Sequence, residues 1–136
     1  MAKGKTSYGC GLDAAVDVVG GKWKPGILWA VHHGPMRFGE LRRRVPGVSE
    51  KVLVQQLREL EADGVVHREV YPEVPPRVEY SLTELGRALN TALIPLGEWG
   101  DTFMELIVAH KEAARNGPSG RQPGAAGAGS PLGRTP

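Results

Sequence analysis

Two short amphipathic helical stretches, joined by only four residues, constrain the fold of this chain more than any other feature of its sequence. Apolar residues recur at i, i+3 and i+7 over residues 38–45, and at i, i+4 and i+7 over residues 53–60, so each stretch has one face to bury. Pro46 and Gly47 end the first helix, and Ser49 is a favourable N-cap for the second. Two helices joined by so short a turn are typical of a helix-turn-helix.

The segments around this helix pair predict further helices and one β-hairpin. Two helices precede the pair, at residues 12–19 and 22–33, each with an apolar stripe at helical spacing. Met36-Arg37 is a short extended piece. Residues 65–71 are rich in β-branched side chains and residues 77–82 alternate between polar and apolar, so the Pro-rich segment between them joins two strands into a hairpin.

The last predicted helix is long and contains two residues that oppose helix formation. Thr83 caps it, and apolar residues continue at helical spacing to about His110. Pro95 and Gly97 lie inside it and are expected to kink or divide it. A helix-turn-helix followed by a hairpin predicts a winged helix, a mainly α fold with a small β-hairpin in the α+β class.

Length and composition set the expected domain organisation. The chain has 136 residues, enough for one domain with its own core, and its single Cys excludes an intramolecular disulfide. We expect a flexible N-terminal arm at residues 1–8, the winged helix-turn-helix domain at 9–112, and a disordered Gly/Pro/Ala-rich tail at 113–136. No apolar run is long enough to span a bilayer and no signal peptide is present, so we expect a cytoplasmic protein without membrane contact.

The near-neutral net charge of +2 hides two oppositely charged blocks. Residues 22–58 carry eight Lys and Arg against two Glu, whereas residues 59–110 carry three Arg against ten acidic side chains. The basic block covers the helix-turn-helix, and a basic patch on such a unit favours contact with DNA phosphates. The alternative is that the charges only coat two solvated faces.

Four motifs of the sequence together resemble one known family. They are Gly20-Gly21-Lys22-Trp23, the segment GPMRFGEL at residues 34–41, the spaced set Ser49, Val52-Leu53 and Leu57-Arg58-Glu59-Leu60, and the segment VYPEVPPRVEYSLTELG at residues 70–86. Through these motifs the chain, from about Cys10 to Trp99, resembles the HxlR-type winged helix-turn-helix transcriptional regulators of bacteria. The resemblance implies a homodimer, joined by its first and last helices, that binds inverted repeats in promoters as a repressor or an activator.

The same resemblance implies a role for Cys10. Many members of the family have a Cys just before the first helix, which in some of them senses oxidants or electrophiles. Cys10 matches that position, with Gly11 where Pro is usual. A dimer could join two such cysteines, or each could take a thiol adduct. From the residues alone, a small packing side chain is an equally good interpretation of Cys10.

The helix after the tight turn carries polar side chains opposite its leucine stripe. On a helical wheel, Lys51, Gln55 and Arg58 lie on the face opposite Leu53. Lys and Arg can read guanine edges in the major groove, and Gln can read adenine. We therefore predict Lys51 and Gln55 as base readers and Arg58 as a base reader or phosphate clamp. The alternative is an ordinary solvent-facing helix surface.

Further side chains are expected at the DNA backbone. Ser49 opens the recognition helix, whose N-terminus can receive a phosphate, and Arg77 lies at the wing, within reach of the minor groove or the backbone. Lys22 and Lys24 could touch phosphate at the start of the second helix. The complete expected set of DNA-binding residues is Ser49, Lys51, Val52, Gln55, Gln56, Arg58, Arg42, Arg43 and Arg77.

Apolar residues at both ends of the folded part exceed what a small winged helix buries alone, so they predict a dimer interface between two copies of the chain. Its expected residues are Leu12, Val16, Val19, Leu96, Trp99, Phe103 and Leu106. The alternative is that these residues belong to the core of one chain. A pocket lined by Trp23, Trp29 and Trp99 could hold a small-molecule effector, although such residues are more often simply core.

Taken together, the sequence predicts a sequence-specific DNA-binding transcriptional regulator. It would act as a homodimer on an inverted-repeat promoter site, under the control of thiol oxidation or a small ligand. The alternative is a winged-helix protein-interaction module without operator specificity, which would carry apolar groups on the exposed helix face. The four His residues lack metal-ligand spacing and no catalytic motif is present, so we expect no metal, no cofactor and no enzymatic activity.

Overall fold

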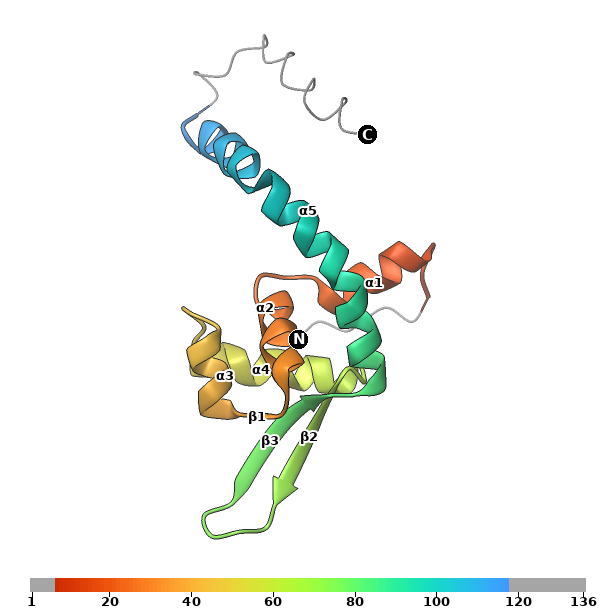
Figure 1. Cartoon of the computed structure of the whole chain (residues 1–136), viewed down its shortest axis with the longest axis vertical. Coiled ribbons are helices and arrows are strands. Elements are labelled where there is room, and N and C mark those ends of the chain that lie inside the picture. The colour runs from red at the N-terminus through yellow and green to blue at the C-terminus, as the bar shows by residue number, and fades with distance from the viewer. Residues whose placement is uncertain (1–6, 118–136) are drawn as a thin grey trace. The chain divides into compact units, whose positions relative to one another are not determined.

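The predicted helix-turn-helix and hairpin are both present in a computed structural model, which describes residues 7–117 (Figure 1). The chain divides into two units at the Ile94–Pro95 peptide, inside its last helix. The elements follow in the order α1 (Gly11–Val19), α2 (Lys24–Ala30), the 3-10 turn η1 (Val31–His33), β1 (Met36–Arg37), α3 (Phe38–Arg44), α4 (Glu50–Ala62), β2 (Val66–Tyr71), β3 (Arg77–Leu82) and α5 (Glu84–Arg115). The first unit has the winged-helix order, which confirms the predicted fold class.

The structure describes only part of the arm and the tail that are expected at the two ends of the chain. Helix α5 continues to Arg115, beyond the expected end of the domain at residue 112. The rest of the expected tail, residues 118–136, and residues 1–6 of the expected arm lie outside the described residues.

The core of the first unit forms where α2, α3 and α4 meet. Ile27 and Leu28 of α2 and Leu41 of α3 are fully buried. The stripe on α4 is buried as predicted, with Leu53, Leu57 and Leu60 all within 1% of complete burial. Burial of each such side chain contributes about 1.5–3 kcal/mol, so the leucine stripe holds α4 firmly in one orientation.

Local chemistry fixes both ends of α4. The Ser49 hydroxyl accepts a hydrogen bond from the Val52 amide at 3.2 Å, which confirms the predicted N-cap. At the other end Gly64 adopts a φ of 79°, a conformation that favours glycine, and it leads directly into the buried pair Val65 and Val66. The helix therefore begins and ends where its sequence requires.

The three strands form an antiparallel sheet in the order β1-β3-β2. Strand β1 pairs only with the middle of β3, through Met36 opposite Tyr80 and Arg37 opposite Glu79. The β2–β3 ladder runs further, to Tyr71 opposite Arg77. The far half of the hairpin is therefore two-stranded, and it extends away from the helices of the first unit as the wing (Figure 1).

The first part of α5 is tied closely to the strands and to α2. Thr83 caps the helix, because its hydroxyl accepts from the Gly86 amide at 3.0 Å and donates to the Gly64 carbonyl at 2.6 Å. A Cβ at Gly86 would overlap the Val65 carbonyl, so only glycine fits at this close approach. Asn90 is fully buried, and its amide nitrogen donates to the Leu28 carbonyl at 2.9 Å.

Helix α5 is continuous through Pro95, so of the two expected outcomes the division of the helix is wrong, and a kink stays a prediction. A proline removes one backbone hydrogen bond and crowds the preceding turn, a cost of about 3 kcal/mol. Apolar residues continue at helical spacing on both sides of Pro95, in keeping with a helix that does not end there. The boundary between the two units nevertheless falls at this proline.

Candidate nucleic-acid interface

The outer face of α4 is polar and open to solvent. Lys51, Gln55 and Arg58 are all exposed, whereas Val52 and Gln56 beside them are half-buried. The exposed set lies opposite the buried leucines, as the helical wheel predicts. A rigidly held helix with long polar side chains on its outer face has the geometry that is needed to enter a major groove.

Positive charge continues from α4 onto the preceding helix. Arg42, Arg43 and Arg44 are exposed at the end of α3, where they also face the carbonyl end of that helix. Arg42 lies 3.7 Å from Glu50, the first residue of α4, and both side chains are about half exposed or more. Such a long, solvated ion pair contributes little, so the guanidinium of Arg42 stays available to a phosphate.

The expected phosphate contact by Lys24 is wrong. Lys24 is buried, and its Nζ lies 2.6 Å from Oε1 of Glu59 on α4. The ammonium holds the pKa of Glu59 below its ordinary value, chiefly through this contact. A buried ammonium needs such a partner, so Lys24 joins α2 to α4 instead of reaching DNA. Lys22, by contrast, is exposed and lies over the Trp23 ring at 4.8 Å.

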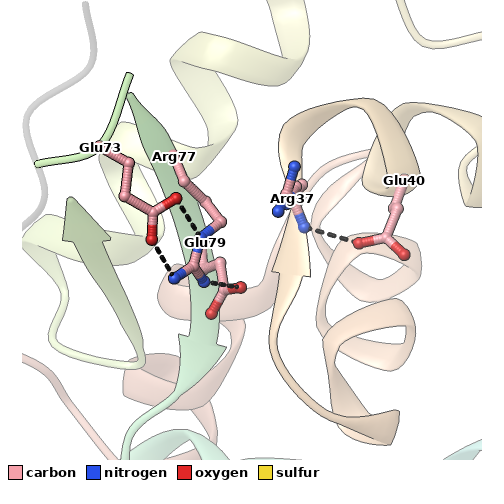
Figure 2. A network of polar contacts seen from close by, with 5 residues as sticks. All are labelled: Arg37, Glu40, Glu73, Arg77 and Glu79. Carbon is pink, nitrogen blue, oxygen red and sulfur yellow. Dashed lines mark hydrogen bonds and ion pairs between the residues drawn. The ribbon is translucent and has the colours of Figure 1, made fainter. Parts of the chain in front are cut away.

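The wing holds its arginine in an internal network. Figure 2 shows the Arg77 guanidinium between Glu73 and Glu79, with NH2 at 2.8 Å from Glu73 and NH1 at 2.7 Å from Glu79. The guanidinium also stacks on the Tyr71 ring, 3.8 Å from its centroid. These carboxylates raise the pKa of Arg77, and the Arg77 hydrogen bond lowers the pKa of Glu73. The structure therefore gives Arg77 a role in shaping the wing that the sequence does not indicate.

Arg37 is placed beside the wing without joining its network. Its backbone amide donates to Oε1 of Glu40 at 2.9 Å, which closes the first turn of α3 (Figure 2). The side chain of Arg37 is exposed, and its charge contributes to the lowered pKa of Glu73. Arg37 thus adds an accessible positive charge between α3 and the wing.

Cys10 is exposed and immediately precedes α1, as its N-cap residue. The surroundings nearby are acidic, because Asp13 lies in the first turn of α1 and Asp17 one turn further. The Tyr8 hydroxyl donates to Asp17 at 2.6 Å, and this bond raises the pKa of Tyr8 to about 12. The position leaves the thiol accessible to a reagent.

The apolar face of α1 is largely unburied in the first unit. Leu12 and Val16 are 71% and 54% exposed. Val19, predicted with them at the dimer interface, is half-buried and packs partly against the core together with Val18. The reason is its place at the end of α1, where the chain turns toward the buried residues of α2.

The second unit shows the same character along α5. Leu96 and Trp99 are more than half exposed, and Phe103 and Leu106 are half-buried. The rings of Trp99 and Phe103 lie 5.8 Å apart, centroid to centroid. Met104 and Val108, which are not among the predicted interface residues, are exposed as well. Exposed apolar side chains at helical spacing over so many turns are typical of a surface that another chain covers.

Three structural features were not predicted from the sequence pattern. The Lys24–Glu59 pair joins residues 35 positions apart, and a lysine in the first turn of a helix gives no sign that it is buried. Asn90 is buried with its amide oxygen unpaired, and Trp29, expected near an effector pocket, instead lies half exposed and stacked on His32 at 4.6 Å. The Lys24–Glu59 pair and the Asn90–Leu28 hydrogen bond join elements that are distant in the chain, whereas Trp29 and His32 are only three residues apart.

Within residues 7–117, no group of three or more His, Cys, Asp or Glu side chains is arranged to hold a metal ion. None of the helices in this part of the chain is long and apolar enough to cross a membrane.

Known proteins that are similar to this chain in sequence are named as transcriptional regulators. The family model described as HxlR-like helix-turn-helix matches residues 18–107. YybR of Bacillus subtilis (strain 168), named as an uncharacterised HTH-type transcriptional regulator, is 47% identical over 115 residues, which cover 82% of this chain and 92% of YybR.

Solved structures are similar in both sequence and fold. The redox regulator HypR in its reduced form is 47% identical, with a TM-score of 0.69, over 72% of this chain and 97% of that one. Its oxidised form is 50% identical, with a TM-score of 0.65, over 68% of this chain and 96% of that one. The exposed polar face of α4, the wing and these similarities agree: the chain belongs to the HxlR-like helix-turn-helix family of transcriptional regulators, which are not enzymes.

Proposed function

We propose that the protein is a homodimeric regulator that binds an inverted-repeat promoter site through the outer face of α4. The observation that carries this proposal is the arrangement of Lys51, Gln55 and Arg58, all exposed, opposite a leucine stripe that is buried to within 1%. A protein-interaction module would present apolar groups there. The polar face therefore favours DNA over the alternative function.

In this proposal the side chains have distinct roles. Lys51 and Gln55 read base edges, and Arg58 reads a base or clamps a phosphate. Arg42, Arg43 and the N-terminus of α4, capped by Ser49, hold the backbone. Val52 and Gln56 flank the reading face and contact DNA only at its margin.

Arg77 has a different role in the proposal from the one its position in the sequence indicates. Two carboxylates already satisfy its guanidinium, so a phosphate would have to compete with both Glu73 and Glu79. We infer that Arg77 keeps the wing in shape and that any contact of the wing with DNA is secondary.

The exposed apolar faces of α1 and α5 support the dimer. Leu12, Val16, Leu96 and Trp99 are each more than half exposed, which is costly for a protein that stays monomeric. An isologous interface would bury the same residues on both copies and place two α4 helices for two half-sites. Sedimentation velocity tests this directly, and a monomeric mass at micromolar concentration contradicts it.

Control by a thiol reagent is the last part of the proposal. Cys10 is exposed at the start of α1, and a similar protein of solved structure is described as a redox regulator. We infer that oxidation or alkylation of Cys10 changes the geometry of the dimer and so its affinity for DNA. Operator affinity measured before and after treatment with diamide, with Cys10→Ser as the control, tests it.

The DNA-binding function itself is tested with a library of double-stranded DNA. The full chain is incubated with a randomised 30-base-pair library, and bound DNA is recovered and sequenced over several rounds. We expect an inverted repeat to be enriched, and binding to weaken by about 0.9 log units per phosphate contact for each tenfold increase in salt. Enrichment of no sequence would refute the proposal.

A further inference from the structure

The amide of Gln55 has a neighbouring carboxylate that accepts a hydrogen bond from its nitrogen. Gln55 Nε2 donates to Oε2 of Glu59 at 3.4 Å, one turn further along α4. A carboxylate accepts hydrogen bonds and cannot donate them, so the nitrogen of the amide faces Glu59 and the oxygen faces away. The contact therefore favours one orientation of the Gln55 amide, with its nitrogen toward Glu59 and its oxygen away from it.

Glu59 is in turn anchored from inside the domain. Its other oxygen, Oε1, lies 2.6 Å from Nζ of Lys24, whose side chain is only 9% exposed. The two carboxylate oxygens thus have separate partners, a buried cation on one side and an exposed amide on the other. The contacts with Lys24 and Gln55 hold the pKa of Glu59 below its ordinary value, so the group is an anion at neutral pH.

We propose that Glu59 is a specificity-determining residue, which makes Gln55 select adenine over guanine at one position of the DNA site. A glutamine amide has two N–H donors and one acceptor oxygen. With one N–H given to Glu59, Gln55 keeps one donor and one acceptor, which match the N7 acceptor and the N6 amino group of adenine. Guanine presents two acceptors, N7 and O6, and would require both N–H groups.

Glu59 acts here as a positioning residue, because the base is contacted by Gln55. The inference rests on the proposed function, since it needs α4 to enter a major groove. It also gives the buried Lys24 a part in recognition: Lys24 fixes Glu59, and Glu59 fixes the amide. An unanchored Gln55 could turn its amide and use both N–H groups on guanine.

The test begins with the randomised 30-base-pair library and the full chain. Selections with the wild type and with Gln55→Ala identify the base pair whose preference depends on Gln55. Duplexes with A·T or G·C at that pair are then compared by fluorescence anisotropy. We expect Glu59→Gln to lower the preference for adenine over guanine about tenfold, and to leave preferences at other positions and the salt dependence unchanged.

Two further variants separate positioning from folding. Glu61→Gln removes the same charge from an exposed side chain of the same helix, so the preference for adenine should be unchanged. Lys24→Met combined with Glu59→Met removes both members of the ion pair, leaves no buried charge unpaired and leaves the Gln55 amide no side-chain acceptor at position 59. This double variant should melt close to the wild type and still show the reduced preference for adenine.

Each remaining outcome overturns the inference. An unchanged ratio of adenine to guanine in both Glu59 variants refutes it while the DNA-binding function stands. A site that Gln55→Ala leaves unchanged at every position refutes it too, because Gln55 would then read no base. If the wild type enriches no sequence at all, the proposed function itself fails and the inference fails with it.

Discussion

The recognition helix α4 and the wing use their charged side chains in opposite ways. On α4, Lys51 and Arg58 are exposed opposite a packed leucine stripe. On the wing, Arg77 is enclosed by Glu73 and Glu79 and stacked on Tyr71. Packing from one side holds the helix and leaves its outer charges free, whereas a two-stranded ribbon has no such support and is held by its own charges.

The difference shows that a count of basic residues does not measure the charge available to DNA. Residues 22–58 contain eight basic side chains, but one of them, Lys24, is buried and forms an ion pair with Glu59. The wing has an arginine at the expected place, yet this guanidinium forms ion pairs with both Glu73 and Glu79. Variants of each region should therefore affect different measurements.

The largest expected effect is on the helix. Lys51→Ala combined with Gln55→Ala should lower affinity for the selected DNA site roughly hundredfold, since each good base contact is worth about 1–3 kcal/mol of discrimination. Fluorescence anisotropy measures the affinity, and circular dichroism should show the same helix content and melting temperature. Lys111→Ala, which removes an exposed charge from α5, is the matched control and should change the affinity little. Equal losses in both variants would mean that α4 contributes only general charge.

The inner side of the same helix should respond in stability. Glu59→Ala leaves the buried Lys24 ammonium without its partner, at a cost of about 1–3 kcal/mol in the free energy of unfolding. Glu61→Ala on the exposed side should cost less than about 0.5 kcal/mol. Urea denaturation followed by circular dichroism compares the two, and equal midpoints would show that the ion pair does not stabilise the fold.

The same contrast explains what could be predicted from the sequence. The leucine stripe of α4 repeats at helical spacing, so both its buried face and its polar face follow from local order. Ser49 and Thr83 were recognisable caps because a cap bonds to residues two or three positions away. Local periodicity and local hydrogen bonding thus predicted most of the winged helix.

The rest depends on which side chains meet across the fold. The residues next to Lys24 in the chain give no indication of its ion pair with Glu59, which lies 35 residues further on. Arg77 and Glu79 are two positions apart, and residues at i and i+2 lie on the same face of a strand. Their pairing therefore follows from the sequence only if residues 77–79 are already known to form a strand. Pro95 favoured a break in α5, yet the helix continues through it although the apolar residues on either side are exposed. Sequence reasoning failed where the role of a side chain depended on a partner that only the tertiary structure brings close.

Removing the negative charges around Arg77 should make the wing, like α4, a positively charged surface for DNA. Glu73→Gln combined with Glu79→Gln removes the two negative charges that neutralise the Arg77 guanidinium, so the wing gains net positive charge that can attract a phosphate. We expect affinity for DNA of any sequence to rise several-fold and the salt dependence to steepen by about 0.9 log units per tenfold change in salt. Glu98→Gln combined with Glu105→Gln on α5 is the control for total charge. A salt dependence that both pairs steepen equally would show that Arg77 gains no phosphate contact.

The smallest expected effect is the titration of the wing. Arg77 lowers the pKa of Glu73, so the folded pKa lies below the unfolded one. The stabilisation by this pair is therefore complete above the unfolded pKa of about 4.3 and is lost as the pH falls through the lower, folded value. Carbon-detected NMR of the Glu73 carboxyl should place its midpoint below that of a free glutamate, and Arg77→Gln should return it to the ordinary range.

The outcome of this titration decides whether the wing and α4 differ in the positive charge that they offer to DNA. If Glu73 titrates at the ordinary value in the wild type, the wing does not neutralise its own arginine in solution. Arg77 would then be as free as Lys51, and the wing would count as a second positively charged surface for DNA. A lowered midpoint that disappears in Arg77→Gln leaves α4 and the end of α3 to hold the DNA.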